Sequence, residues 1–153
     1  AGVAREAELR AEAVASFEGL RDSGQHRSAM LAGGYYTSGK GFQKVATVCL
    51  LLERLVGSQD NRTEECCDWL MAAFRCYYDP SAPADECKGV SRSYYDEQWG
   101  GIAEQAGWDR RECNSDYGNT CYNDHHYHFG YFVVSAAILG KLRPESLRDR
   151  TFV

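Results

Sequence analysis

The sequence predicts an all-α fold in which helices are joined by long loops. Apolar residues recur at intervals of three and four in several stretches, which is the helical period. Glycine and proline separate these stretches, and alternation at a period of two is scarce. A chain of 153 residues is long enough to bury a core and suits one domain, so we treat residues 1–153 as a single segment.

Two helices are expected in the first part of the chain. Residues 3–21 are rich in Ala, Glu, Leu and Arg, which favour helix, and Gly24 ends this stretch. Apolar residues then recur at helical spacing over residues 39–56, which predicts a second helix. Ser38 is the expected N-terminal cap of that helix, and Gly57 ends it.

A third helix is predicted to begin at Asn61, because Asn61 and Glu64 form a variant of the capping box. Asp79 and Pro80 end it, since a proline disfavours helical backbone at the residue before it. Residues 79–121 are expected to be mostly irregular. A loop of that length is usually functional or covalently fixed.

The last long helix is predicted over residues 124–139, with Gly140 at its end. Arg143 and Pro144 then begin another helix, with proline in its first turn. The sequence stops about two turns into that helix. We therefore expect a piece of a larger architecture that is incomplete at its C-terminal end.

The seven cysteines, at positions 49, 66, 67, 76, 87, 113 and 121, are many for a chain of this size. Cys49 lies inside an apolar helical stretch, which predicts a buried free thiol. Cys113 and Cys121 enclose a short polar loop, so we expect these two to pair. Disulfide connectivity does not follow from sequence alone, and the other pairings stay open at this point.

Further cysteine positions extend this hypothesis. Cys76 and Cys87 are additional disulfide candidates, and of the neighbours Cys66 and Cys67 one is expected to be bridged and the other to be a buried thiol. Residues 61–63 have the form of an N-glycosylation acceptor, with Asn61 as the attachment site. The excess of cysteine together with this acceptor favours a secreted, extracellular protein.

The charge and hydropathy of the chain argue against two kinds of partner. The formal net charge is -5 and no basic cluster is present, which argues against nucleic acid and against an anionic membrane surface. No run of eighteen apolar residues occurs, so we expect no segment that spans a membrane. The abundant tyrosines suit a surface that stacks on sugars, and they suit ordinary packing equally.

The most informative stretch covers residues 122–132, with the sequence YNDHHYHFGYF. It combines one carboxylate, three imidazoles and several aromatic rings, directly before an apolar run. On a helix, Asp124, His128 and Tyr131 share one face, because they are spaced by four and three residues. A carboxylate in the first turn of a helix is stabilised as the anion by the helix dipole. The stretch therefore predicts a polar site at a helix N-terminus.

The residue types leave three interpretations of this stretch open. In the first, Asp124 is a general acid in a carbohydrate cleft, where aromatic walls provide part of the burial that keeps such an acid protonated. In the second, Asp124 ligates a metal together with His125 or His128. In the third, the cluster is a hydrogen-bonded structural corner.

The same stretch resembles the signature of glycoside hydrolase family 81, the endo-1,3-β-glucanases, whose form is close to Tyr-Asn-Asp-His-His-Phe-His-Tyr-Gly-Tyr-Phe. Other segments agree with the family in order and spacing: residues 36–40 (YTSGK), 95–102 (YDEQWGGI) and 116–119 (DYGN). The resemblance covers roughly residues 35–143. The chain departs from the signature at Tyr127, where the family has Phe, and at Phe129, which lacks the hydroxyl of the family's Tyr.

The resemblance implies part of an (α/α)6 barrel that hydrolyses β-1,3-glucan with inversion, outside the cell or in the cell wall. Asp124 matches the family's general acid. The residues expected to bind the sugar around it are Tyr36, Trp99, Tyr122, Asn123, His125, His126 and His128. The resemblance implies neither a cofactor nor a metal.

The resemblance also implies a second carboxylate that this chain lacks. Inversion needs a base roughly 6.5–9.5 Å from the acid, and the family supplies it from a later Glu-x-x-x-Glu segment. The only glutamate after Asp124 is Glu145. We therefore expect two partners, β-1,3-glucan and the remainder of the catalytic domain. The alternative is a non-catalytic protein, glucan-binding or structural, that derives from such a hydrolase.

Overall fold

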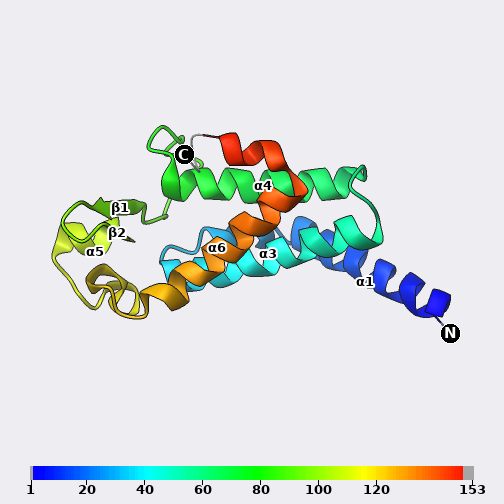
Figure 1. Cartoon of the computed structure of the whole chain (residues 1–153), viewed down its shortest axis with the longest axis horizontal. Helices are drawn as coiled ribbons and strands as arrows, with labels where there is room; N and C mark the ends of the chain where they lie inside the picture. The colour runs from blue at the N-terminus through cyan, green and yellow to red at the C-terminus, as the bar shows by residue number, and fades with distance from the viewer. Residues whose placement is uncertain (1, 150–153) are drawn as a thin grey trace.

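The computed structural model describes residues 2–149, which are predominantly helical (Figure 1). The long helices are α1 (Gly2–Asp22), α3 (Tyr35–Leu55), α4 (Asn61–Tyr78) and α6 (His125–Leu142). The shorter elements are α2 (Gln25–Met30), β1 (Ser93–Asp96), β2 (Gly101–Glu104), α5 (Gln105–Arg110) and the 3-10 helices η1 (Ser115–Cys121) and η2 (Pro144–Arg148). The all-α prediction is confirmed, whereas closure into an (α/α)6 barrel stays a prediction. No helix within residues 2–149 has the length and apolarity that crossing a bilayer requires.

Helix α3 is the centre of the core, and α1, α2, α4 and α6 pack against it (Figure 1). Phe42 of α3 is fully buried, and its ring centroid lies 4.6 Å from that of Phe74 in α4 and 4.8 Å from that of Phe132 in α6. A Cβ at Gly39 would lie 2.9 Å from the Cβ of Tyr131, so this glycine lets α6 approach α3 closely. The core therefore holds α6, which carries the predicted site, against the other helices.

Only the C-terminal half of α1 joins the core. Ala13, Phe17 and Leu20 are buried, whereas residues 2–12 are exposed. The N-terminal half of α1 extends away from the other helices in Figure 1. The predicted first helix thus contributes to the core along only half of its length.

Helix α3 begins at Tyr35 rather than at residue 39, and the predicted cap Ser38 lies inside the helix. The N-cap residue is Gly34. Ser38 is buried, and its hydroxyl oxygen accepts a hydrogen bond of 3.1 Å from the backbone N–H of Ala32. The cap prediction was wrong because a serine hydroxyl can satisfy a preceding loop from within a helix as well as from its end.

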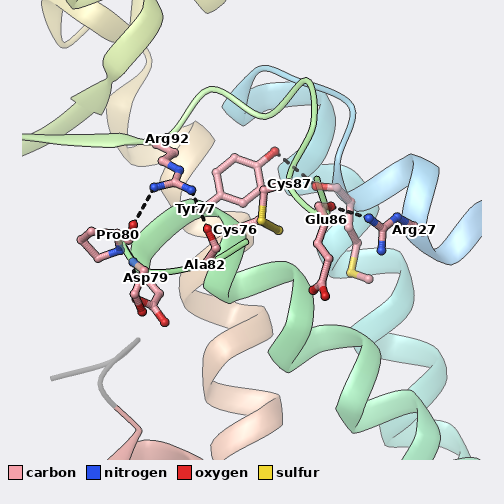
Figure 2. Close-up of a disulfide and its surroundings, with 11 residues drawn as sticks. Arg27, Cys76, Tyr77, Asp79, Pro80, Ala82, Glu86, Cys87 and Arg92 are labelled. Atoms are coloured by element: carbon pink, nitrogen blue, oxygen red, sulfur yellow. Dashed lines mark hydrogen bonds between the residues drawn. A yellow bond between two sulfur atoms is a disulfide. The ribbon is translucent and has the colours of Figure 1, made fainter. Parts of the chain in front are cut away.

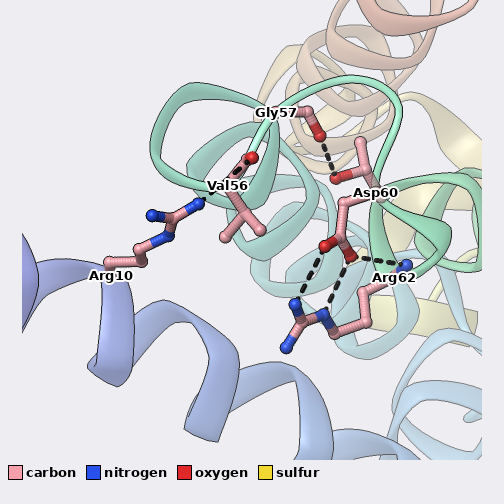
Figure 3. Close-up of polar contacts among 6 residues, drawn as sticks. Arg10, Val56, Gly57, Asp60 and Arg62 are labelled. Carbon is pink, nitrogen blue, oxygen red and sulfur yellow. Dashed lines mark hydrogen bonds and ion pairs between the residues drawn. The ribbon is translucent and has the colours of Figure 1, made fainter.

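Asp60 rather than Asn61 caps α4 (Figure 3). The Asp60 carboxylate accepts a hydrogen bond of 2.9 Å from the backbone N–H of Arg62 and lies 2.8 Å from the guanidinium of the same residue. These interactions with Arg62 lower the pKa of Asp60 to about 2. Asn61 is the first residue of α4 and is exposed, so glycosylation at Asn61 stays a prediction.

The segment expected to be irregular contains a β-hairpin followed by α5 and η1. Strands β1 and β2 pair antiparallel, with Ser93 opposite Glu104 and Asp96 opposite Gly101. Each strand has only four residues, which is too short for a period-two pattern to stand out. The hairpin and α5 lie at the end of the molecule opposite the N-terminus (Figure 1).

One disulfide joins the pair predicted from the sequence, and a second joins two further candidates whose pairing was open. Cys113 and Cys121 close the loop that precedes the candidate site. Cys76 at the end of α4 is bonded to Cys87 in the next loop (Figure 2). The same loop is held further by Arg92, whose guanidinium donates to the backbone carbonyl of Ala82 at 2.9 Å.

The third disulfide overturns the prediction of a free thiol at Cys49. Cys49 of α3 is bonded to Cys66 of α4, with a Cα–Cα distance of 5.5 Å. Cys49 is fully buried as expected, but its helix faces a second helix whose cysteine lies within bonding reach. Cys67 is the buried free cysteine, which confirms the prediction that one of the neighbours Cys66 and Cys67 is bridged and the other is a thiol.

Helix α6 does not end before Gly140 as predicted but continues to Leu142. A Cβ at Gly140 would lie 2.8 Å from the Leu147 side chain, so this glycine makes room for η2. The final predicted helix is the short 3-10 helix η2, with Pro144 in its first position. Glycine here serves close packing rather than termination.

Candidate functional site

The candidate site lies where η1 meets α6, and its backbone is unusual. Within residues 2–149, every non-glycine residue with positive φ falls between the end of α5 and the start of α6: Arg111, Asp116, Tyr117, Tyr122 and Asp124. The left-handed conformation costs a non-glycine residue roughly 1–2 kcal/mol. Such residues persist where the surrounding structure holds them, and they concentrate at functional sites. The backbone therefore points to the same stretch as the sequence.

Asp124 occupies the N-cap position of α6 with a φ of 49°. Its backbone carbonyl accepts the N–H of His128 at 3.0 Å, but its carboxylate makes no capping hydrogen bond. The Asp124 side chain is exposed. The carboxylate thus lies at the surface, near the positive end of the α6 dipole, where a ligand can approach it.

Four tyrosines from α3, η1 and α6 form an aromatic group that we term the tyrosine cluster: Tyr36, Tyr117, Tyr127 and Tyr131. The ring centroid of Tyr36 lies 5.1 Å from that of Tyr117 and 5.8 Å from that of Tyr127. Tyr117 and Tyr127 are 66% and 56% exposed. Exposed rings with a polar tip are suited to stacking and hydrogen bonding with a sugar.

His128 lies behind the tyrosine cluster rather than on its open side. It is 1% exposed, and its ring centroid lies 5.4 Å from that of Tyr36. Its Nδ1 atom is 3.5 Å from Oδ2 of Asp116 and makes no hydrogen bond. Asp116 in turn accepts the backbone N–H of Tyr36 at the start of α3, at 3.2 Å. His128 therefore contacts the cluster from the interior.

The other two histidines differ in exposure. His125 is half-buried between the rings of Tyr122 and Phe129, at centroid distances of 4.9 and 4.6 Å. Burial, with a smaller contribution from the neighbouring His126, lowers the pKa of His125. His126 is exposed. Phe129, the residue that lacks the family's hydroxyl, packs against Tyr35 on the core side.

Asn123, Tyr122 and Trp99 complete the predicted sugar-binding set. Asn123 is exposed, and its amide donates to the backbone carbonyl of Tyr117 at 3.0 Å. Trp99 is 76% exposed at the hairpin turn. The Tyr122 hydroxyl donates to the carboxylate of Asp96 at 2.9 Å. Partial burial, followed by this hydrogen bond, raises the pKa of Tyr122 to about 12.

The geometry bears on the metal interpretation as well. Among the residues that the structure describes, no three His, Cys, Asp or Glu side chains converge to hold a metal ion. Asp124 is exposed, whereas the His128 ring is buried and faces Asp116. The three residues considered as metal ligands, Asp124, His125 and His128, therefore do not form a site.

Two carboxylates at the site had no predicted role. Asp96 and Asp116 lie in segments that resemble the family, at residues 95–102 and 116–119, but the sequence offers no indication of what either contacts. Each accepts hydrogen bonds from a residue of the predicted set, Asp96 from Tyr122 and Asp116 from Tyr36. Both carboxylates connect segments that are remote in sequence.

Comparisons with known proteins identify the family of this chain. Residues 8–152 match the model of the glycosyl hydrolase family 81 C-terminal domain. A glucan endo-1,3-beta-D-glucosidase of Arthroderma benhamiae is 36% identical over 109 residues, which is 71% of this chain and 11% of that protein. The primary septum glucan endo-1,3-beta-D-glucosidase of Schizosaccharomyces pombe is 34% identical over 110 residues, 72% of this chain and 10% of that protein.

A shorter match extends to plants. A glucan endo-1,3-beta-D-glucosidase of Glycine max is 50% identical over 50 residues, which is 33% of this chain and 7% of that protein. The family model covers nearly the whole chain, and two fungal relatives are more than 30% identical to it. The chain belongs to glycosyl hydrolase family 81. It spans about a tenth of the length of the two fungal relatives, which are 11% and 10% covered.

Proposed function

We propose that this chain supplies the general acid and part of the sugar cleft of an inverting endo-1,3-β-glucanase. Asp124 donates its proton to the glycosidic oxygen, and the leaving sugar departs as an alcohol. The observation that carries the proposal is the exposed carboxylate of Asp124, which makes no capping hydrogen bond at the start of α6, the helix that also carries Tyr127 and Tyr131 of the tyrosine cluster. The fungal relatives named as glucan endo-1,3-beta-D-glucosidases support β-1,3-glucan as the substrate class.

In this proposal the predicted residues divide by exposure. Asn123, His126 and Trp99 are exposed and contact the sugar directly. Tyr36, Tyr122 and His125 are half-buried and line the floor of the cleft. His128 is buried and supports the tyrosine cluster from behind.

The base of the proposed reaction lies outside these helices. Inversion places the two carboxylates roughly 6.5–9.5 Å apart. Glu145 follows the 18 residues of α6, which extend for about 27 Å at 1.5 Å per residue. Glu145 is therefore too far from Asp124 to activate the water. We propose that another part of the catalytic domain, in the same or a companion polypeptide, supplies the base.

That separation also favours the second candidate function. A chain that keeps the aromatic surface and the acid but meets no base would bind glucan without cleaving it. The proposal and this alternative share the substrate and differ only in turnover. Both place the protein outside the cell or in the cell wall, which the three disulfides support.

Calorimetric titration with laminarihexaose, a β-1,3-glucan, tests the shared substrate, with cellohexaose as the β-1,4-linked control. We expect binding of the first and not of the second. Equal affinity for both, or for neither, would remove the β-1,3-glucan assignment. The nearly isosteric Asp124→Asn variant should retain this binding.

Turnover separates the enzyme from the binding protein. When the segment is joined to the remainder of a family 81 catalytic domain, Asp124→Asn should lower kcat by about 10²–10⁴, the usual contribution of a general acid. The first product seen by NMR should be the α-anomer, because the mechanism inverts. Undiminished turnover of the variant, or a β-anomer, would refute the proposed role of Asp124.

A further inference from the structure

The turn of the β-hairpin is organised by one buried carboxylate. Asp96 ends β1 and is 2% exposed. Its Oδ1 atom accepts the backbone N–H of Gln98 at 2.9 Å and that of Trp99 at 3.3 Å. Its backbone carbonyl accepts the N–H of Gly100 at 2.7 Å. The backbone that presents the exposed Trp99 ring is therefore bonded to Asp96.

The other oxygen of the same carboxylate faces the candidate site. Oδ2 of Asp96 accepts the Tyr122 hydroxyl at 2.9 Å, across 26 residues of sequence. Tyr122 is two residues before Asp124, and its ring lies against the ring of His125 at a centroid distance of 4.9 Å. The carboxylate thus joins the hairpin turn to the segment that carries the proposed acid.

The packing at Gly101 holds Tyr122 against the hairpin. Gly101 lies opposite Asp96 in the strand register. A Cβ at Gly101 would lie 2.5 Å from the Cε1 atom of Tyr122, a separation too short for any side chain. The space that this glycine leaves open is occupied by the tyrosine ring, so it does not serve as clearance for a glucan chain.

We propose that Asp96 is a positioning residue that fixes Trp99 and Tyr122 relative to each other, so that the hairpin and the start of α6 form one sugar-binding surface. Asp96 does not touch the substrate in this inference; it acts through the two aromatic residues. The proposed sugar contacts rest on the proposed function, whereas the coupling of the two aromatics does not.

Both oxygens of the Asp96 carboxylate accept hydrogen bonds at once. A buried carboxylate with no partner would be costly, and a hydrogen bond to a charged group contributes more than a neutral one. Removing the carboxylate releases the turn and Tyr122 together. An amide at the same position keeps the shape: its oxygen still accepts from the turn, and its NH2 group can donate to the Tyr122 oxygen.

Asp96→Ala and Asp96→Asn in the complete chain test the coupling by NMR. In Asp96→Ala, the Trp99 amide should exchange about tenfold faster, since a bond to a charged group is lost. In the same variant, the pKa of Tyr122, followed with 13C-labelled tyrosine, should fall below about 12, because the hydrogen bond and the charge of Asp96, which add to the effect of burial, are lost. Asp96→Asn should restore the slow exchange of the Trp99 amide but not the high pKa of Tyr122, because the negative charge is absent.

Glu97→Gln is the matched control, since Glu97 is exposed in the same turn. This variant should change neither the exchange rate of the Trp99 amide nor the pKa of Tyr122. An unchanged Tyr122 ionisation in folded Asp96→Asn would overturn the inference, and so would Asp96→Ala if it altered only one of the two aromatics. If circular dichroism shows that Asp96→Ala does not fold, the Tyr122 pKa in Asp96→Asn decides whether Asp96 contacts Tyr122 as proposed.

Binding of laminarihexaose tests whether the positioning by Asp96 matters for sugar binding. Asp96→Ala should weaken binding about tenfold, which corresponds to about 1.4 kcal/mol, and Asp96→Asn should weaken it less. Wild-type affinity in folded Asp96→Ala would overturn the positioning role. If the wild-type chain does not bind the hexasaccharide, the proposed function fails, and the exchange and ionisation measurements still decide whether Asp96 couples Trp99 to Tyr122.

Discussion

The helical core and the candidate site of this molecule differ in backbone conformation and in the exposure of their aromatic rings. Helices α3 and α4 pack through fully buried rings such as Phe42 and are joined by the Cys49–Cys66 disulfide, and neither has a non-glycine residue at positive φ. Residues 111–124 have five such residues and include the exposed Tyr117 of the tyrosine cluster. The core provides stability, and the site uses part of that stability to hold a strained backbone. Substitutions should therefore separate the two regions.

The largest separation is expected between two aromatic truncations. Phe42→Ala should lower the free energy of unfolding by about 3–5 kcal/mol, because it removes a fully buried ring from the contact of three helices. Tyr127→Ala should change it by about 0.5 kcal/mol or less, since the ring is 56% exposed. Urea denaturation followed by circular dichroism measures both. Similar losses in the two variants would contradict the division into core and site.

Removal of single disulfides should also distinguish the core from the candidate site. Replacing Cys49 and Cys66 by alanine should cost about 3 kcal/mol, as expected for a loop of 17 residues. Replacing Cys113 and Cys121, which are 8 residues apart, should cost about 2.5 kcal/mol and should also weaken laminarihexaose binding, since that loop precedes the site. Chemical denaturation and calorimetric titration of both double variants check this. Loss of glucan affinity in the core variant alone would reverse the assignment.

The strain at Asp124 predicts a gain in stability on mutation. Asp124→Gly should raise the free energy of unfolding by about 1 kcal/mol, because glycine adopts positive φ freely and the aspartate side chain makes no capping bond. Asp124→Ala is the matched control and should destabilise the chain, since alanine suits this conformation poorly. Thermal unfolding ranks the variants. A glycine variant less stable than the wild-type protein would show that the aspartate side chain stabilises this position by more than the backbone strain costs.

The smallest expected effect is a pH dependence at the site. Burial lowers the pKa of His125, so the unfolded chain binds a proton more readily than the folded chain. Stability contributed by neutral His125 is complete well above the ordinary histidine pKa of about 6.5 and declines as the pH falls below it. His125→Gln should flatten the stability profile between about pH 7 and pH 5. An unchanged slope, with the core variant Phe42→Leu as a reference, would assign the dependence to another group.

The sequence predicted the helices well where a helix-favouring stretch is followed by a glycine or a proline. The expected helix over residues 3–21 corresponds to α1, and Asp79 ends α4 as predicted. The start of α3 was misplaced because Ser38, although a good capping residue, lies inside the helix, and at the correctly predicted start of α4 the cap is Asp60 rather than Asn61. The hairpin was missed because strands of four residues carry too little pattern. The position of Asp124 before an apolar helix was evident from the sequence.

The contacts within the site could not be predicted from the sequence. Asp116 bonds to Tyr36 across 80 residues, and Asp96 bonds to Tyr122 across 26. No periodicity relates residues that far apart. Residue types likewise did not separate the buried His128 from the exposed His126, although both lie in one short motif. The burial of each depends on which face of α6 meets α3.

Amino-acid order alone determined that this chain is helical, that it carries the family signature and that its aspartate stands at the start of a helix, because these properties depend on neighbours within one or two turns. The tertiary structure decided which cysteine pairs with Cys49, which histidine is buried and which carboxylate holds Trp99 and Tyr122. Those outcomes depend on how helices and hairpin pack together, and packing brings into contact residues that local propensity cannot relate.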